Sequence, residues 1–120
     1  MAGGFGTRLK PLTINRPKPM VPVANRPMME HIVDLLKGHG ITDLVSILYF
    51  QPDHITSYFG DGSDFGVRMQ YVTAEADYGT AGAVRNAAHL LGDERVLVIS
   101  GDVLTDFDLA EAVQVHEQRN

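Results

Sequence analysis

The sequence predicts an α/β fold in which a doubly wound, mainly parallel sheet carries helices on both faces. Apolar runs of strand length alternate with segments of helical periodicity, and the links between them are short. Hydrophobic residues make up 44% of the 120 residues and charged residues 21%, as in an ordinary folded domain. Such a sheet binds its ligands at the carboxyl ends of its strands.

The first half of the chain predicts a helix, a strand and a second helix. Pro27 suits a first helical turn, apolar residues then recur at helical spacing, and Gly38 ends the helix. Leu44–Phe50 is a continuous apolar run with β-branched members, which predicts a buried strand. A short helix is predicted over Asp53–Phe59, and the stretch Gly60–Gly66 has the composition of a turn.

The second half predicts two strands and two helices. Val67–Thr73 alternates as a strand, and the alanine-rich segment Ala81–Leu91 predicts a helix. Arg95–Ser100 contains the run VLVI and predicts another buried strand. A last helix is predicted over Leu109–Gln118.

The start and end of the sequence are unusual for this layout. A glycine-rich loop in an α/β sheet normally follows a strand, but only Met1 and Ala2 precede Gly3. At the other end, Asn120 lies within a helical pattern. We therefore expect the 120 residues to be a fragment of a longer protein, trimmed at both ends.

The charges of the chain are unevenly distributed. The first 29 residues carry five basic side chains and no acid, whereas the other 91 carry five basic and fifteen acidic side chains. The basic part opens with Gly3, Gly4 and Gly6, which allow backbone N–H groups to approach a ligand closely. Backbone donors with arginine and lysine, and without a competing carboxylate, suit a polyphosphate.

Two common nucleotide motifs do not fit this loop. The dinucleotide motif G-x-G-x-x-G would need a glycine where Leu9 stands, and no G-K-[ST] of a P-loop is present. A nicotinamide enzyme would also need an acid after the second strand, and Tyr49–Gln51 has none. The glycines alone could form a simple turn, but the acid-free basic stretch after them favours phosphate binding.

Two further segments are expected at the carboxyl edge of the sheet. Asp102 follows the VLVI run, and a lone carboxylate there suits Mg²⁺, although an aspartate in a turn is the alternative. Asp106 and Asp108 are interpreted as caps of the last helix. The small residues of Gly79–Ala83 could let a flat ring or a sugar lie against the backbone, with close helix packing as the alternative.

The composition argues against several other functions. The chain has no cysteine, its histidines lack a zinc-binding spacing, and no serine lies in a G-x-S-x-G elbow. The acidic body and scattered aromatic residues argue against nucleic-acid binding. The longest apolar run is far shorter than the roughly 18 residues of a membrane span. We therefore expect a cytoplasmic protein without nucleic-acid or membrane partners.

The combined motifs resemble the sugar-1-phosphate nucleotidylyltransferases. The segment GGFGTRL, followed ten residues after its arginine by the lysine of RPKPMVPV, is similar to the family signature. The resemblance continues through NRPMMEHIVDLLKGHGI, SYFGDGSDFGV, GTAGAVRNA and VISGDVLTDFDL. It is greatest to bacterial mannose-1-phosphate guanylyltransferases, including those fused to a phosphomannomutase-like domain. It implies a Rossmann-like nucleotide-diphospho-sugar transferase fold, with residues 1–120 as its N-terminal nucleotide-binding part and no second domain within these 120 residues.

The resemblance also implies roles for the matching residues. Arg8 would hold the β- and γ-phosphates, Lys18 would contact the α-phosphate and the sugar phosphate, and Asp102 would bind Mg²⁺. The implied nucleotide-binding residues are Gly3, Gly4, Gly6, Thr7, Glu75, Gly79 and Thr80. The glycines Gly3, Gly4 and Gly6 would contact the phosphates, and the last three residues the base or sugar. Relatives often have proline and leucine where this chain has Asp77 and Tyr78.

The implied reaction joins a nucleoside triphosphate and a sugar 1-phosphate into a nucleotide-sugar and pyrophosphate, foremost GTP and mannose 1-phosphate into GDP-mannose. The alternative within the family is uridylyl or thymidylyl transfer to glucose 1-phosphate. The alternative of another class is a non-catalytic regulatory relative that binds nucleotide-sugar, which would be expected to lose Arg8, Lys18 or Asp102. Both a monomer and a homo-oligomer stay open. The segment alone is expected to be inactive, because the family's sugar pocket and second metal aspartate would lie after residue 120.

Overall fold

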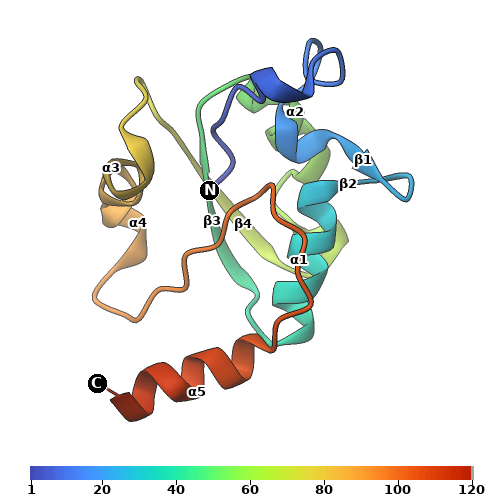
Figure 1. The fold of residues 1–120 in the computed structure, drawn as a ribbon. Coiled ribbons are helices and arrows are strands. Elements are labelled where there is room, and N and C mark those ends of the chain that lie inside the picture. Colours follow the sequence, from blue (N-terminus) through green and yellow to red (C-terminus); the bar gives the residue numbers. More distant parts are fainter. Residues whose placement is uncertain (120) are drawn as a thin grey trace.

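The computed structural model describes residues 1–119 and has a pair of parallel strands at its centre (Figure 1). β3 (Asp43–Leu48) runs parallel to β4 (Arg68–Thr73), and their register pairs Asp43 with Arg68. The crossover between them contains α2 (Pro52–Phe59), as a parallel pair requires. Both strand predictions are confirmed, although β3 ends two residues earlier than predicted. Asn120, the predicted end of the nucleotide-binding part, lies outside the described residues.

Met1 and Ala2 take the position of the strand that normally precedes a glycine loop. The Ala2 N–H donates to the carbonyl of Ile47 in β3 at 2.8 Å. On the other side, the Met1 nitrogen donates to the Ile99 carbonyl at 2.9 Å, and the Gly101 N–H donates to the Met1 carbonyl at 2.6 Å. This alternation is that of a parallel ladder. The glycine loop therefore leaves from the middle of the sheet, between β3 and residues 99–101.

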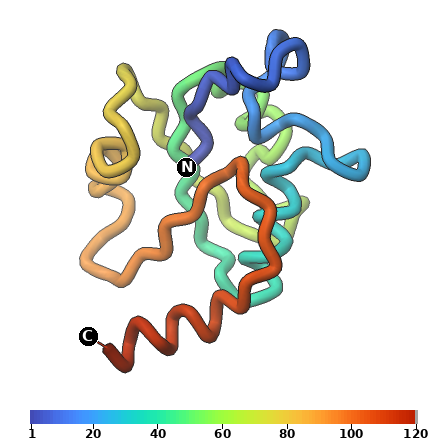
Figure 2. Tube along the Cα trace, viewed as in Figure 1, coloured from blue at the N-terminus to red at the C-terminus, as the bar shows by residue number. Residues whose placement is uncertain are grey.

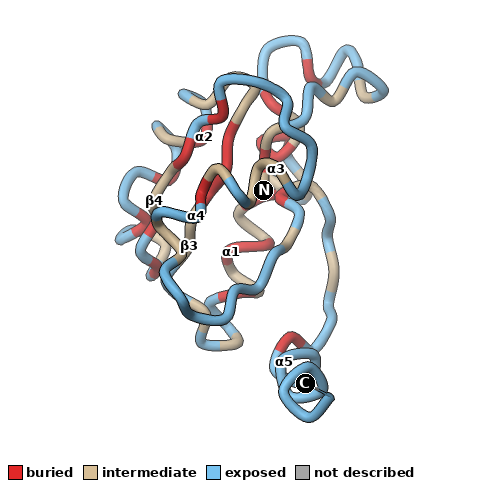
Figure 3. Tube along the Cα trace, turned by 90° about the vertical axis from the view of Figure 1, so that its left-hand side faces the viewer, coloured by how far each residue is buried: buried red, intermediate tan, exposed pale blue. Residues whose placement is uncertain are grey.

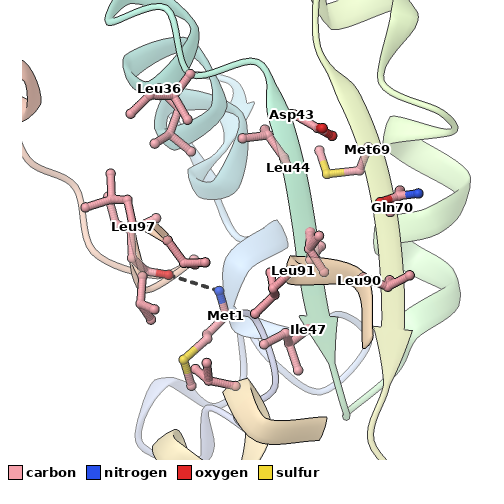
Figure 4. Close-up of a pocket in the computed structure, with 18 of the residues that line it drawn as sticks. Met1, Leu36, Asp43, Leu44, Ile47, Met69, Gln70, Leu90, Leu91 and Leu97 are labelled. Atoms are coloured by element: carbon pink, nitrogen blue, oxygen red, sulfur yellow. Dashed lines mark hydrogen bonds between the residues drawn. The ribbon is translucent and has the colours of Figure 1, made fainter. Parts of the chain in front are cut away.

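The prediction of a buried strand over Arg95–Ser100 is wrong. In the described chain no strand forms there, and Val96, Leu97 and Val98 are exposed by 46%, 39% and 49%. A strand needs a neighbouring backbone along its length, but this segment meets one only at its end, beside Met1. An apolar cavity of about 260 Å³ separates the rest of the segment from β3 (Figure 4). None of the predicted site residues lines this cavity.

Helices cover both faces of the sheet, as predicted (Figures 1 and 2). α1 (Met28–Gly38) and α2 share one core cluster with β3, which contains Val33, Leu48, Ile55 and Phe59. The opposite face packs against α3 (Gly79–Asn86) and α4 (Ala88–Leu91). These two replace the single helix predicted over Ala81–Leu91. The chain bends at Ala87, which is fully buried and clusters with Ile47 and Val72.

The last helix, α5 (Leu109–Arg119), extends away from the sheet (Figure 3). Only its first residue, Leu109, is buried, and it clusters with Ile32 and Leu36 of α1. Asp108 is the N-cap, because its Oδ1 accepts the Glu111 N–H at 3.0 Å. Within residues 1–119, no helix is both long enough and apolar enough to cross a membrane.

A short antiparallel hairpin, which was not predicted, follows the basic loop. It consists of β1 (Pro22–Val23) and β2 (Arg26–Pro27). Its two turn residues, Ala24 and Asn25, have φ values of 50° and 64°, as in the type I′ turns that join twisted strands. The Arg26 guanidinium donates to Asp34 of α1 at 2.8 Å. This contact ties the end of the basic segment to the body of the fold.

Candidate active site

The glycine loop turns sharply where it leaves the sheet. Gly6 has a φ of 61°, a conformation that favours glycine. A Cβ at this position would lie 2.8 Å from Cγ2 of Thr13 and 3.1 Å from Cβ of Lys18. The buried Thr13 hydroxyl donates to the Gly6 carbonyl at 2.7 Å. The missing side chain of Gly6 therefore lets Thr13 and Lys18 pack directly against the loop.

We expect Gly6→Ala to lower the free energy of unfolding by about 1–2 kcal/mol, because alanine is strained at this φ. The new methyl group would also push Thr13 and Lys18 away from the loop. The matched control is Gly4→Ala, since a Cβ on Gly4 meets no atom within 4 Å. Urea unfolding of both variants measures the difference. Equal stabilities of the two variants would contradict the role assigned to Gly6.

The structure brings Lys18 and Asp102 together from distant parts of the sequence. The Lys18 Nζ lies 2.7 Å from Oδ2 of Asp102, and each side chain is 32% exposed. Lys18 begins a short 3₁₀ helix and stands between the fully buried Pro17 and Pro19, which hold its backbone. Asp102 follows Gly101, where a Cβ would lie 2.9 Å from the Met1 carbonyl oxygen. The pair thus lies beside the glycine loop, at the predicted carboxyl edge of the sheet.

Thr7 and Arg8 lie on an exposed 3₁₀ turn, Thr7–Leu9, which directly follows Gly6. Within residues 1–119, Arg8 forms no ion pair, and neither do Lys10 and Arg16. An exposed guanidinium without a protein carboxylate can meet the anionic groups of a ligand. The nucleotide-binding role of Thr7 and the phosphate-binding role of Arg8 stay predictions.

A cavity of about 210 Å³ joins the glycine loop to the start of α3. Its lining includes four of the predicted nucleotide-binding residues, Gly3, Gly4, Gly79 and Thr80. Glu75 is exposed and does not line it, so the structure does not bring this predicted residue to the others. Asp77 and Tyr78, which the sequence marked only as departures from the family pattern, do line the cavity.

An aromatic cluster beside the glycine loop was not predicted. The Phe5 ring packs edge-on against Tyr49, with ring centroids 5.5 Å apart, and lies 5.0 Å from the ring of Phe50. Phe5 and Tyr49 also line the 210 Å³ cavity. Phe5 is far in the sequence from the adjacent Tyr49 and Phe50, so the sequence gave no sign of a cluster. The only available signal was that Phe5 lies between two glycines of the loop.

Asp102 is the carboxylate that the described residues place next to Lys18, where it could hold a divalent cation. Within residues 1–119, no three histidine, aspartate or glutamate side chains gather into a metal-binding group. Mg²⁺ usually binds through one or two carboxylates together with water and substrate phosphates. Asp102, partly exposed beside the glycine loop, fits a cation that is shared with a bound nucleotide.

Comparisons with known proteins agree with the motifs and the fold. Residues 1–120 match the family model described as nucleotidyl transferase. Mannose-1-phosphate guanylyltransferase of Mycobacterium tuberculosis is 39% identical over 97% of this chain, and UTP–glucose-1-phosphate uridylyltransferase of Synechocystis is 34% identical over 99%. A crystal structure from Bacillus anthracis, assigned as a glucose-1-phosphate thymidylyltransferase, has a TM-score of 0.89 and 33% identity over 98% of this chain.

The match covers only part of each relative. The chain spans about a third of the two curated relatives, 32% and 34%, and 48% of the solved chain. Over that part, both the sequence resemblance and the predicted nucleotide-diphospho-sugar transferase fold are confirmed. The chain belongs to the nucleotidyl transferase family.

Proposed function

We propose that this chain is the nucleotide-binding part of an enzyme that converts GTP and mannose 1-phosphate into GDP-mannose and pyrophosphate. The observation that carries the proposal is the contact of Lys18 with Asp102, at 2.7 Å, beside the glycine loop. This edge combines backbone donors, a fixed ammonium group and a carboxylate, which suits two phosphorylated substrates and a cation. The guanylyltransferases among the relatives support the choice of GTP and mannose 1-phosphate.

The proposed reaction needs little covalent participation by the protein. An oxygen of the sugar phosphate attacks the α-phosphorus of GTP in line. A bond forms between them, the bond from the α-phosphorus to the bridging oxygen breaks, and pyrophosphate leaves. The nucleophile is already anionic, so no strong general base is needed. Lys18 would hold the α-phosphate and the sugar phosphate, and Arg8 the β- and γ-phosphates. Catalysis is then positioning and cancellation of charge.

Asp102 is the residue that would hold Mg²⁺. The bound cation would neutralise charge on the nucleotide phosphates. Gly3, Gly4, Gly6 and Thr7 would add donors to the phosphates, and Gly79 and Thr80 would face the base or sugar. Glu75, which is exposed and does not line the cavity, has no part in this proposal. A cytoplasmic location stays a prediction, and both a monomer and a homo-oligomer stay open.

A second candidate is uridylyl or thymidylyl transfer to glucose 1-phosphate. Two of the similar proteins carry these activities in their names. Both candidates use the same phosphate edge, so they differ only in the base and the sugar.

We expect the complete protein to turn over GTP with mannose 1-phosphate at least about tenfold faster than UTP or dTTP, because a base site rejects analogues that leave its polar groups unpaired. The measurement is the initial rate of pyrophosphate release for each nucleotide with mannose 1-phosphate and with glucose 1-phosphate. Equal rates for the three nucleotides with mannose 1-phosphate would reject guanylyl specificity. A clear preference for UTP or dTTP with glucose 1-phosphate would select the second candidate. Binding of nucleotide without turnover of any pair would favour a regulatory relative.

A further inference from the structure

We propose that Asp77 and Tyr78 select the base of the nucleotide, with Asp77 accepting hydrogen bonds from guanine and Tyr78 stacking on its ring. This inference rests on the proposed function, since it assigns the base within the same site. Its starting point is that both residues line the 210 Å³ cavity, together with Gly3 and Gly4 of the glycine loop.

The charge of this cavity favours a base over a phosphate. Among the described residues, no lysine or arginine lines it, and Asp77 is its one acidic lining residue, which would repel a phosphate. The basic side chains lie elsewhere: Lys18 contacts Asp102, and Arg8 lies on the exposed turn after Gly6. A nucleotide whose phosphates lie at those cations would therefore place its uncharged base in the cavity.

Tyr78 packs closely against the start of α3, because Gly82 has no side chain that would push it away. A Cβ on Gly82 would lie only 2.7 Å from Cβ of Tyr78, so Tyr78 lies directly on the helix backbone. The residue is nevertheless 47% exposed. An aromatic ring that lines a cavity and still has open surface can stack on a base, and every base has a face to offer.

The Asp77 carboxylate is oriented by the backbone and has acceptor capacity left. Its Oδ1 accepts the Gly79 N–H at 3.1 Å. Within residues 1–119, no lysine, arginine or histidine forms a salt bridge with Asp77. An ionised carboxylate can only accept hydrogen bonds, and its two oxygens offer about four acceptor positions. Asp77 therefore keeps free acceptor positions for a ligand.

This acceptor matches guanine better than the pyrimidines. Guanine presents two neighbouring donors on one edge, the N1–H and the exocyclic amine. Uracil and thymine present a single N–H between two carbonyl oxygens, which a carboxylate repels. A base outside a helix is commonly read through this edge and by stacking on aromatic side chains. Asp77 would thus discriminate guanine from the pyrimidines. Tyr78 would contribute a binding affinity that is the same for all bases.

The first test uses the unchanged complete protein and three ligands. Calorimetry in the presence of Mg²⁺, without sugar phosphate, gives the Kd of GTP, UTP and inosine triphosphate, which differs from GTP only in lacking the exocyclic amine. We expect inosine triphosphate to bind about tenfold more weakly than GTP, the scale of losing one bond of a bidentate pair. Equal affinities of these two nucleotides would overturn the role of Asp77.

The second test uses variants. Asp77→Asn keeps an acceptor for the Gly79 N–H but replaces an acceptor by a donor, so the preference for GTP over inosine triphosphate should disappear. Tyr78→Leu should weaken all three nucleotides about tenfold while their ratios stay the same, and Tyr78→Phe should bind as the parent does. Asp93→Asn, an exposed carboxylate outside the cavity, is the control.

The outcomes separate the inference from the proposed function. If the parent protein binds none of the three nucleotides, the proposed function fails and the inference fails with it. If the parent binds GTP tightly and Asp77→Asn keeps the parent's selectivity, the inference fails alone. If Tyr78→Leu binds the three nucleotides as tightly as the parent does, Tyr78 does not stack on the base. Circular dichroism of each variant checks that it is folded.

Discussion

Replacing Lys18 by alanine is expected to lower kcat of the complete enzyme about a hundredfold or more, the scale of losing one preorganised donor to a transition-state oxyanion. The buried Pro17 and Pro19 hold the lysine backbone, and Asp102 holds its Nζ at 2.7 Å. The ammonium group is therefore positioned before substrate binds, so little reorganisation is needed during the reaction. Arg8→Ala is expected to cause a loss of similar size, through weaker charge cancellation on the departing pyrophosphate.

The controls for this prediction test whether kcat depends on the positions of the Lys18 and Arg8 charges or only on the net charge of the protein. Arg16→Ala removes an exposed cation from the same acid-free stretch and should leave kcat within a few-fold of the parent. Lys18→Arg keeps the charge but not its compact shape, so it should recover only part of the activity. Steady-state kinetics with both substrates measure kcat and KM separately. If Lys18→Ala and Arg8→Ala both keep a near-normal kcat, neither Lys18 nor Arg8 takes part in catalysis.

Asp102→Asn is expected to keep the fold and to raise the Mg²⁺ concentration for half-maximal activity by about tenfold or more, since even indirect partners of a metal alter its affinity by this factor. Asparagine has nearly the same shape and can still accept a hydrogen bond from Lys18, but it lacks the negative charge that Mg²⁺ prefers. A titration of activity with Mg²⁺, at saturating nucleotide, measures the shift. Binding of Mn²⁺ followed by paramagnetic resonance gives a readout that does not depend on turnover.

The matched control is Asp106→Asn, an exposed aspartate on the same segment. It should leave the Mg²⁺ requirement unchanged, because within residues 1–119 Asp106 forms no ion pair with Lys18 or any other basic side chain. If Asp102→Asn and the parent protein need the same Mg²⁺ concentration, Asp102 is not a metal ligand.

Local patterns were sufficient for most of the fold. The helical spacing after Pro27 predicted α1, and the apolar run from Leu44 predicted β3, because each pattern reports burial along a single element. The run at Arg95–Ser100 has the same local pattern as β3, yet it forms no strand in the described chain. The difference is that β3 has β4 along its whole length, whereas the other run meets a backbone only beside Met1.

The candidate site shows the same division between local and long-range information. The glycine loop and the acid-free basic stretch were readable, since both are contiguous in the sequence. The sequence pointed to Lys18 and Asp102 separately, but their 2.7 Å contact depends on the pairing of Met1 with Gly101. The position of Asp77 and Tyr78 in the lining of the 210 Å³ cavity likewise depends on how α3 packs against the sheet.

The sequence by itself determined the α/β class, the two central strands with the helix between them, the family and the position of the glycine loop. These properties follow from periodicity, composition and contiguous motifs, which neighbouring residues carry. Only the tertiary structure decided that Lys18 meets Asp102, that Glu75 lies apart from the cavity, and that Asp77 and Tyr78 line it. Those facts depend on side chains from separate elements meeting at one sheet edge. The crossover geometry and the packing of each helix set that meeting, and neither has a local signature in the sequence.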